Sequence, residues 1–336
     1  MERVFGNYGE SYAMSPECCN QILKRNPGSI ASVATDESGK FKHLCVAYKC
    51  SLDGFKNGCR PILGLDGCFL KGKYGGMCLS IMSLDANNGL FPIAIFLCRK
   101  ENKDNWTEFL RIMAPYLKLH PRTLTLISDR EKGLISAVET NFSDVNHHHK
   151  YCFRHMYKNF KRYHSGKHLE ALAWNAARSY VKEDHDIEIS KMRDLRPEAV
   201  DYLHKEDSAQ WGRAFFDTSS SCEHITSNFC EAFNAWILDI RGLPLCKFLE
   251  KYHLMVTRFW DVTGIPCEHA INAFFFNKNA DWKELLDEYH FVAKYRETYE
   301  GMVGPMDNES KWKKKEDIEH RVSPPPFEPQ KGRPRT

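Results

Sequence analysis

The chain has 336 residues and a hydrophobic content of 42%, enough to bury a large core in one main domain with appendages. Its formal charge of +3 is almost neutral, so the overall balance does not indicate a nucleic-acid binder. Thirteen cysteines without a regular spacing argue against a secreted disulfide scaffold, and the N-terminus lacks the apolar core of a signal peptide. The longest apolar run, Leu90 to Cys98, is far shorter than the ~20 residues of a membrane span. We therefore expect a soluble intracellular protein with no membrane partner.

Residues 1–54 are expected to form an N-terminal fragment, with a helix from the Glu17 region to Leu23 and then a polar, glycine-bearing stretch. Three β-type runs follow closely, and the turn-forming sequences KGKYGG and DANNG between them predict antiparallel hairpins. The pattern NWTEFLRIMAPYL then predicts a helix, which is followed by a fourth β-type run and a second helix. The four β-type runs are Pro61–Leu65, Met77–Leu84, Leu90–Leu97 and Thr123–Ser128.

Two aspartates follow apolar β-type runs directly. Asp66 comes after the first run, in ILGLDGCFLKG, and Asp129 comes after the fourth, in TLTLISDREKGL. The order β-β-β-α-β-α, with acids on the first and fourth strands, matches an RNase H-like core. The predicted fold class is therefore α/β, with a mixed RNase H-like sheet over about residues 55–258.

A third acid lies in a helical setting further along the chain. The charged, helical pattern from about 160 to 225 predicts a helical insertion that separates this acid from the other two. Residues Ser227–Arg241 then predict a helix with one apolar stripe, and Glu231 lies on the face away from that stripe. Glu231 is therefore able to line a groove. The stripe consists of Phe229, Phe233, Trp236, Ile237 and Ile240.

Three converging carboxylates indicate a site for divalent cations. Carboxylates suit Mg²⁺ or Mn²⁺, and two such ions roughly 3.5–4 Å apart can activate a water and stabilise the leaving oxygen of a phosphodiester. We therefore expect Asp66, Asp129 and Glu231 to be both catalytic residues and metal ligands, as in a DDE-type enzyme that cuts and joins nucleic acid. Taken singly, each acid has a simpler explanation, because an isolated aspartate is more often a turn or cap residue.

Six blocks between Gly54 and Pro244 resemble the Mutator-like (MULE) plant transposases, in order and at plausible spacing. No single block is decisive, but the set is specific. The blocks are GFKNGCRPILGLDGCFLKGKYGG, SLDANNGLFPIAIF, TLTLISDREKGL, YCFRHMYKNF, WGRAFF and SNFCEAFNAWILDIRGLP.

The resemblance implies an enzyme that cuts DNA at transposon ends and joins the freed 3′ hydroxyl to a target. Its acids would be Asp66, Asp129 and Glu231, with Asp66 bridging two Mg²⁺ or Mn²⁺ ions and the other two acids each holding one. It also implies DNA as the partner and the nucleus as the location. Full-length relatives usually carry an N-terminal DNA-binding region, and residues 1–50 here lack zinc-finger spacing. If the chain is complete, recognition of the transposon ends would have to come from a partner.

The pair Cys152 and His155 forms a Cys-x-x-His motif that the resemblance also covers. It could be half of a zinc site or a DNA-contacting element near the acids. Two ligands do not complete a tetrahedral zinc site, so another pair would have to come from elsewhere. The alternative is a buried cysteine and a hydrogen-bonded helical histidine.

Residues 259–285 resemble the C-terminal half of a SWIM-type zinc finger, in which Cys-x-Cys is followed later by Cys-x-His. Cys267 and His269 match the second half, and the sequence upstream contains no Cys-x-Cys. A segment is therefore expected to be missing between about Arg258 and Trp260. With two of four ligands, Zn²⁺ binding and folding of this remnant are doubtful, because such modules fold with the metal.

Basic residues form three clusters that could contact DNA. The first carries Phe160 and Tyr163 among its charges, a composition suited to phosphate contact with stacking, although a solvated helix face explains it equally well. The second, KWKKKE, lies within residues 286–336, which are expected to be helical and then a disordered basic tail. The tail KGRPRT resembles an AT-hook core. The residues proposed for DNA contact are Lys158, Lys161, Arg162, Lys167, Arg333 and Arg335.

Three functions compete on this basis. The first is a Mutator-like transposase, or its remnant, with an intact set of acids. The second is a domesticated derivative that binds DNA and regulates without catalysis, and the third is an RNase H-like nuclease acting on RNA or hybrids. Retention of all three acids favours the first, while the missing recognition modules favour the second. The sequence leaves open whether the chain forms a homo-oligomer.

Overall fold

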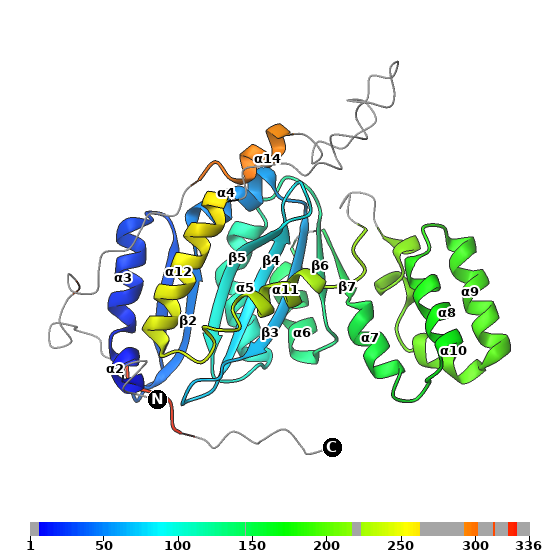
Figure 1. The fold of residues 1–336 in the computed structure, drawn as a ribbon, viewed down its shortest axis with the longest axis horizontal. Coiled ribbons are helices and arrows are strands. Elements are labelled where there is room, and N and C mark those ends of the chain that lie inside the picture. Colours follow the sequence, from blue (N-terminus) through cyan, green and yellow to red (C-terminus); the bar gives the residue numbers. More distant parts are fainter. Residues whose placement is uncertain are drawn as a thin grey trace.

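One seven-stranded mixed sheet forms the centre of the molecule (Figure 1). The computed structural model describes residues 7–144, 146–216, 223–262, 292–301, 312 and 322–327. The strand order is β1-β2-β5-β4-β3-β6-β7, with β6 and β7 parallel to β3 and the remaining neighbours antiparallel. This mixed α/β architecture confirms the expected fold class at that level. The strands are β1 (Ile30–Thr35), β2 (Phe41–Ala47), β3 (Ile62–Phe69), β4 (Met77–Leu84), β5 (Leu90–Cys98), β6 (Leu124–Ser128) and β7 (His147–Tyr151).

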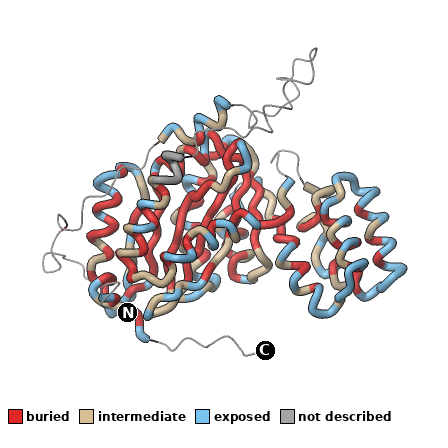
Figure 2. Tube along the Cα trace, viewed as in Figure 1, coloured by how far each residue is buried: buried red, intermediate tan, exposed pale blue. Residues whose placement is uncertain are grey.

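Helices cover both faces of the sheet and bury its strands (Figure 2). One face packs against α2 (Tyr8–Ala13), α3 (Ser15–Arg25), α11 (Asn228–Trp236) and α12 (Leu245–Val262). The other face packs against α4 (Lys49–Gly58), α5 (Lys103–Leu117) and α6 (Lys132–Phe142), and α14 (Val292–Thr298) lies on α4. No helix within the described ranges has the length and hydropathy that crossing a bilayer would require.

The two predicted hairpins are confirmed, since β3 pairs antiparallel with β4 and β4 with β5. Strand β3 is longer than predicted, because it continues past Leu65 to Phe69. Its parallel pairing with β6 ends at the pair Leu65 and Ser128, whereas its pairing with β4 continues to the pair Phe69 and Met77. Asp66 therefore lies inside a strand, at the level where the neighbouring strand β6 ends.

Two strands before residue 55 extend the same sheet, and the sequence did not predict them. β1 pairs with β2, and β2 pairs with β5. β1 is an edge strand in which only Ala31 is buried, so its sequence IASVAT lacks the apolar alternation of an internal strand. The helix expected near Glu17 is present as α3, whose buried side chains pack on this end of the sheet.

A separate helical unit lies between β7 and α11, beside the β7 edge of the sheet (Figure 1). It has an apolar core of its own, which includes the fully buried side chains of Phe153, Phe160 and Trp211. This core explains why the stretch folds as a unit although most of its surface is charged. Its main helices are α7 (Phe153–Phe160), α8 (Lys167–Arg178), α9 (Lys182–Leu195) and α10 (Pro197–Leu203).

Helix α11 approaches β3 very closely at Gly64. A Cβ atom at this position would lie 2.3 Å from both Cys230 Sγ and Phe229 Cε2. We expect Gly64→Ala to lower the free energy of unfolding by about 1–3 kcal/mol, because overpacking would push α11 off the sheet. Chemical denaturation of the variant would measure the loss. Gly242→Ala is the matched control, since its Cβ would meet nothing within 4 Å, and equal stability of the two variants would contradict the prediction.

Candidate active site

Asp66 and Asp129 lie on neighbouring inner strands, just past the point where the pairing of β3 with β6 ends. Each follows the last parallel pair between β3 and β6, which is Leu65 with Ser128. Neighbouring strands are about 4.8 Å apart, so the two residues begin from adjacent backbone positions. One Asp129 oxygen, Oδ1, accepts a hydrogen bond from the Glu131 backbone N–H at 3.0 Å, so this carboxylate also closes its own turn. The structure thus brings together two of the three predicted acids.

The Asp66 carboxylate is held in a largely buried position. Its Oδ1 accepts a hydrogen bond from the Gly67 backbone N–H at 2.9 Å, and its Oδ2 accepts one from Asn234 Nδ2 at 2.8 Å. Burial raises the pKa of Asp66 to about 6, and repulsion by Asp129 adds to the rise against the opposing effects of these hydrogen bonds and of His155. The ionised form of Asp66 is therefore unfavourable at this position, and a bound cation would stabilise it.

A fourth acid, Glu101, belongs to the same cluster and was missed in the sequence. It follows β5, which runs in the same direction as β3 because both are antiparallel to β4. A Cβ atom on Gly67 would lie 3.1 Å from both Glu101 carboxylate oxygens. Burial raises the pKa of Glu101 to about 7, with added repulsion from Asp129 and Asp66, although Trp106 Nε1 donates a hydrogen bond to it at 3.0 Å. The sequence does contain a signal for Glu101, because this acid closely follows the apolar run Leu90–Cys98.

Glu231 lies on α11 and makes an ion pair. Arg154 Nη1, from α7, donates to Glu231 Oε2 at 2.8 Å and to Asn228 Oδ1 at the same distance. Asn234, which contacts Asp66, is three residues after Glu231, so the two side chains lie on one face of α11. Glu231 is therefore about one helical turn from Asn234, the residue that contacts Asp66. The ion pair with Arg154 holds Glu231 in this position.

The Cys-x-x-His motif connects the helical unit to the acids. Cys152 is fully buried, and its Sγ accepts a hydrogen bond from the Ser227 backbone N–H at 3.3 Å, at the start of α11. Burial opposes ionisation of this thiol, but its contacts with His155 and Ser227 lower its pKa overall. Contact with Cys152 raises the pKa of His155 to about 9, and the nearby Asp66 and Asp129 charges contribute, while burial opposes the rise. The Cys152 contact and the charges of Asp66 and Asp129 therefore favour the protonated form of His155.

The donor set fits a hard divalent cation. Its oxygen ligands would be carboxylates, the type that Mg²⁺ and Mn²⁺ prefer. Two buried polar atoms in its wall, Asn234 Oδ1 and His155 Nδ1, have no hydrogen-bond partner among the described residues, and a hydrated ion or a phosphate could satisfy them. Within the described ranges, however, no three histidine, cysteine, aspartate or glutamate side chains are close enough to hold a metal ion together. One reason for the absence of such a group is that the Glu231 carboxylate forms an ion pair with Arg154.

The remaining predicted residues do not join this cluster in the described part of the chain. Lys158, Lys161, Arg162 and Lys167 are exposed on α7, α8 and the turn between them, where Lys161 Nζ lies 4.0 Å from a Glu170 oxygen. Of the two aromatic residues among them, Tyr163 is exposed, but Phe160 is buried in the core of the helical unit and cannot stack on a base. Cys267, His269, Arg333 and Arg335 lie outside the described residues.

The sheet, together with the acids on β3 and just after β5 and β6, defines a mixed α/β domain with a carboxylate-lined site. Residues 62–159, from β3 to α7, match the family model of the MULE transposase domain. The matched segment contains Asp66, Glu101, Asp129 and the Cys152–His155 motif, and it ends before Glu231. No curated protein matches the chain. The match indicates a transposase-related function for this part of the molecule.

Proposed function

We propose that the chain is a Mutator-like transposase, or a remnant of one, that cleaves DNA strands and joins the freed 3′ end to a target. The observation that carries this proposal is the position of Asp66 and Asp129, directly after the last parallel pair of β3 and β6, within the segment that matches the transposase domain. The strand order β5-β4-β3-β6-β7 agrees with an RNase H-like core, to which β1 and β2 are added. A DNA-directed activity of this kind would place the protein in the nucleus.

Asp66, Asp129 and Glu231 would hold two Mg²⁺ or Mn²⁺ ions. When bound, the ions would lower the pKa of an attacking water and stabilise the leaving oxygen of a phosphodiester. The protein residues orient the site: Asn234 fixes one Asp66 oxygen, and the Gly67 backbone N–H fixes the other. His155, whose raised pKa favours the protonated form, would reduce the repulsion between Asp66 and Asp129 and could donate a hydrogen bond to a phosphate oxygen. Glu231 would hold an ion only if its ion pair with Arg154 opened.

Arg154 competes with the metal for Glu231 in this proposal. We expect Arg154→Gln to tighten Mn²⁺ binding by about two- to five-fold, because a half-exposed ion pair contributes only a fraction of a kcal/mol to about 1 kcal/mol. Calorimetric titration of the metal-free protein with Mn²⁺ would measure the change. Arg111→Gln is the matched control, since Arg111 pairs with Glu108 on α5, away from the acids. Unchanged or weaker Mn²⁺ affinity in Arg154→Gln would mean that Arg154 does not compete.

The proposed activity is tested by incubating the purified protein with end-labelled duplex DNA in Mg²⁺, Mn²⁺ or a chelator. Metal-dependent nicks and their joining to a second DNA support a transposase. Parallel reactions with RNA and with RNA–DNA hybrids separate this activity from an RNase H-like nuclease. A folded protein that binds DNA and makes no nicks would instead support the regulatory alternative.

Zinc binding is a separate proposal, at Cys152 with His155 or at Cys267 with His269. The first pair would need further ligands from outside the described residues, and the second pair lies outside them. Elemental analysis of the purified protein would test both proposals. Stoichiometric zinc that is lost in Cys152→Ser or in Cys267→Ser would identify the pair involved.

A further inference from the structure

Helix α11 and the turns that follow it contact β3 at three successive levels. At the first level, a Cβ atom on Gly64 would lie 2.3 Å from atoms of α11. At the second, Asn234 Nδ2 donates to Asp66 Oδ2 at 2.8 Å. At the third, just past the end of β3, the Lys71 backbone N–H donates to the Arg241 carbonyl at 2.7 Å. The chain that carries the third acid therefore continues past Asp66 as far as Arg241.

Arg241 lies against the same face of β3 as Asp66. Side chains alternate along a strand, so Asp66 and Cys68 point to one face, about 7 Å apart along β3. This is the face that α11 covers, because Asn234 on α11 contacts Asp66. The Arg241 guanidinium interacts with the Cys68 thiol both by charge and by a hydrogen bond. The guanidinium is therefore about two strand residues away from the first acid, on the same side of the sheet.

Arg241 also extends the side of α11 that carries the third acid. Asn234 follows Glu231 by three residues and Arg241 follows Asn234 by seven, a spacing that places all three on one side of a helix. Helical turns continue beyond α11, because the backbone N–H groups of Ile237 and Arg241 each bond to the carbonyl four residues earlier. A cation therefore ends the row that begins with Glu231 and contacts Asp66 through Asn234.

No carboxylate in the described part of the chain neutralises the charge of Arg241. Arg154 and Arg130, by contrast, form ion pairs with Glu231 and Glu206. The Arg241 Nε atom is buried and has no hydrogen-bond partner among the described residues. An arginine that retains its charge and part of its donor capacity suits an added anion, and its planar fork matches the oxygens of a phosphate.

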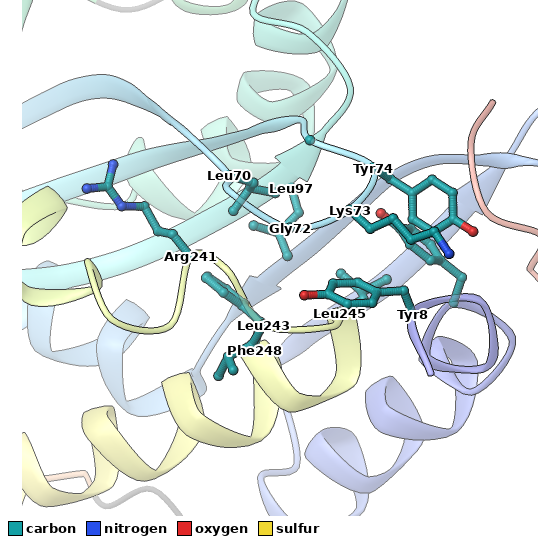
Figure 3. A pocket seen from close by; sticks show the side chains of 12 residues that line it. Tyr8, Leu70, Gly72, Lys73, Tyr74, Leu97, Arg241, Leu243, Leu245 and Phe248 are labelled. Carbon is teal, nitrogen blue, oxygen red and sulfur yellow. The ribbon is translucent and has the colours of Figure 1, made fainter. Parts of the chain in front are cut away.

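The backbone around Arg241 is fixed on both sides. The Lys71 backbone N–H bonds to the Arg241 carbonyl, and the Tyr8 hydroxyl donates to the Gly242 carbonyl at 2.8 Å. Figure 3 shows Arg241 at one end of a small pocket, with its guanidinium pointing away from Tyr8 and Tyr74. Both anchoring bonds end on backbone carbonyls, so they remain when the Arg241 side chain is replaced. The guanidinium is therefore prepositioned, and its role can be tested by substitution.

We propose that Arg241 binds a backbone phosphate of DNA, one or two positions along the strand from the phosphodiester held at Asp66 and Asp129. The inference rests on the proposed function, which places a DNA phosphate at these acids. The spacing follows from the 7 Å or so between Asp66 and Cys68, since successive phosphates of one strand advance about 3.4 Å along the duplex axis. Phosphate contacts position a duplex without reading its sequence, so Arg241 would hold the strand in register with the acids.

The first test measures the affinity of the full chain for duplex DNA at several salt concentrations, with a chelator that keeps the DNA intact. Arg241→Gln should weaken binding by about 10- to 100-fold, because a charge-assisted hydrogen bond is lost. It should also reduce the slope of log affinity against log salt by about 0.9. Arg241→Lys keeps the charge and should retain the slope, with a smaller loss of affinity. Arg111→Gln is the matched control, since Arg111 lies on α5, on the other face of the sheet, and should retain both.

The second test locates the phosphate that Arg241 contacts. The position of the nick made with Mn²⁺ is mapped on end-labelled DNA, and single uncharged methylphosphonates are then placed at the phosphates on either side of it. We expect the wild-type chain to lose affinity at one of the two phosphates nearest the nick on one side, and Arg241→Gln to lose none there. The scan reveals the contact with wild-type protein alone, so it remains decisive if Arg241→Gln does not fold.

Two results would overturn the inference while leaving the proposed function intact. One is a wild-type chain that nicks DNA with metal while Arg241→Gln keeps the wild-type slope or changes no more than Arg111→Gln. The other is a wild-type chain that nicks DNA and tolerates a methylphosphonate at every phosphate within two positions of the nick. Conversely, a reduced slope in Arg241→Gln without nicking by the wild type would support the phosphate contact and refute the proposed cleavage. A chain that binds no DNA would refute both.

Discussion

Asp66→Asn and Asp129→Asn are each expected to slow metal-dependent DNA cleavage by about 10²–10⁴-fold. The expectation follows from the position of these carboxylates, which lie on neighbouring strands where the pairing of β3 with β6 ends. A divalent ion bound there would have them as its closest oxygen ligands. Such ions stabilise the transition state of phosphodiester cleavage by several kcal/mol, and each 1.36 kcal/mol is a factor of ten in rate. Single-turnover nicking of labelled DNA in Mg²⁺ would measure the loss. Glu231→Gln should cause a loss of similar size.

The control for this experiment is Asp53→Asn. Asp53 is an exposed carboxylate that pairs with Lys49 on α4, at the opposite end of β3 from Asp66. It makes the same chemical change without touching the site. DNA affinity of the Asp66 and Asp129 variants should stay normal or increase, since each removes a negative charge near the bound phosphate. Full cleavage activity in either variant would exclude these acids as metal ligands.

The neighbouring positions of Asp66 and Asp129 could be predicted from the sequence, because each acid is marked by its local setting. Asp129 follows the end of β6, whereas Asp66 lies inside β3, at the level where the parallel pairing of β3 with β6 ends, so two local apolar runs place the acids on neighbouring strands. The same reasoning applied to Leu90–Cys98 would have identified Glu101, which follows β5 by three residues. Glu101 is therefore also marked by a local signal in the sequence.

Long-range partners are the part that the sequence could not provide. Arg154 and Glu231 are 77 residues apart, and their ion pair depends on how α7 and α11 pack after the helical unit has folded. Asn234 contacts Asp66 across 168 residues, which requires the close approach of α11 at Gly64. Phe160 shows the opposite error, because a local mixture of basic and aromatic residues suggested an exposed stacking ring where the ring is buried. Each of these contacts is set by tertiary packing rather than by spacing in the chain.

In metal-free buffer at pH 8, Asp66→Asn is expected to increase the stability of the protein. Burial raises the pKa of Asp66 to about 6, above its ordinary value of 3.8, so the folded state binds the proton more tightly than the unfolded state. The stability linked to this proton is fully present below about pH 4 and is lost as the pH rises through about 6. At 1.36 kcal/mol for each pKa unit, the ionised carboxylate costs about 3 kcal/mol at pH 8. We therefore expect a gain of about 1–3 kcal/mol in the variant at pH 8 and none at pH 4.

Divalent metal should reverse the order of stability of the two proteins. A ligand that binds only the folded state stabilises it by about 2.7 kcal/mol at a hundred times its Kd, so Mn²⁺ should raise the melting temperature of the wild type and leave Asp66→Asn nearly unchanged. Thermal unfolding at pH 8, with Mn²⁺ or a chelator, would measure both effects. Asp85→Asn is the control for a structural acid: Asp85 accepts hydrogen bonds from the Asn87 and Gly89 backbones and from the Tyr299 hydroxyl, so its replacement should destabilise the protein by about 1–3 kcal/mol with or without metal. If Asp66→Asn behaves like Asp85→Asn, Asp66 is a structural residue held by Gly67 and Asn234, and the metal site must lie elsewhere.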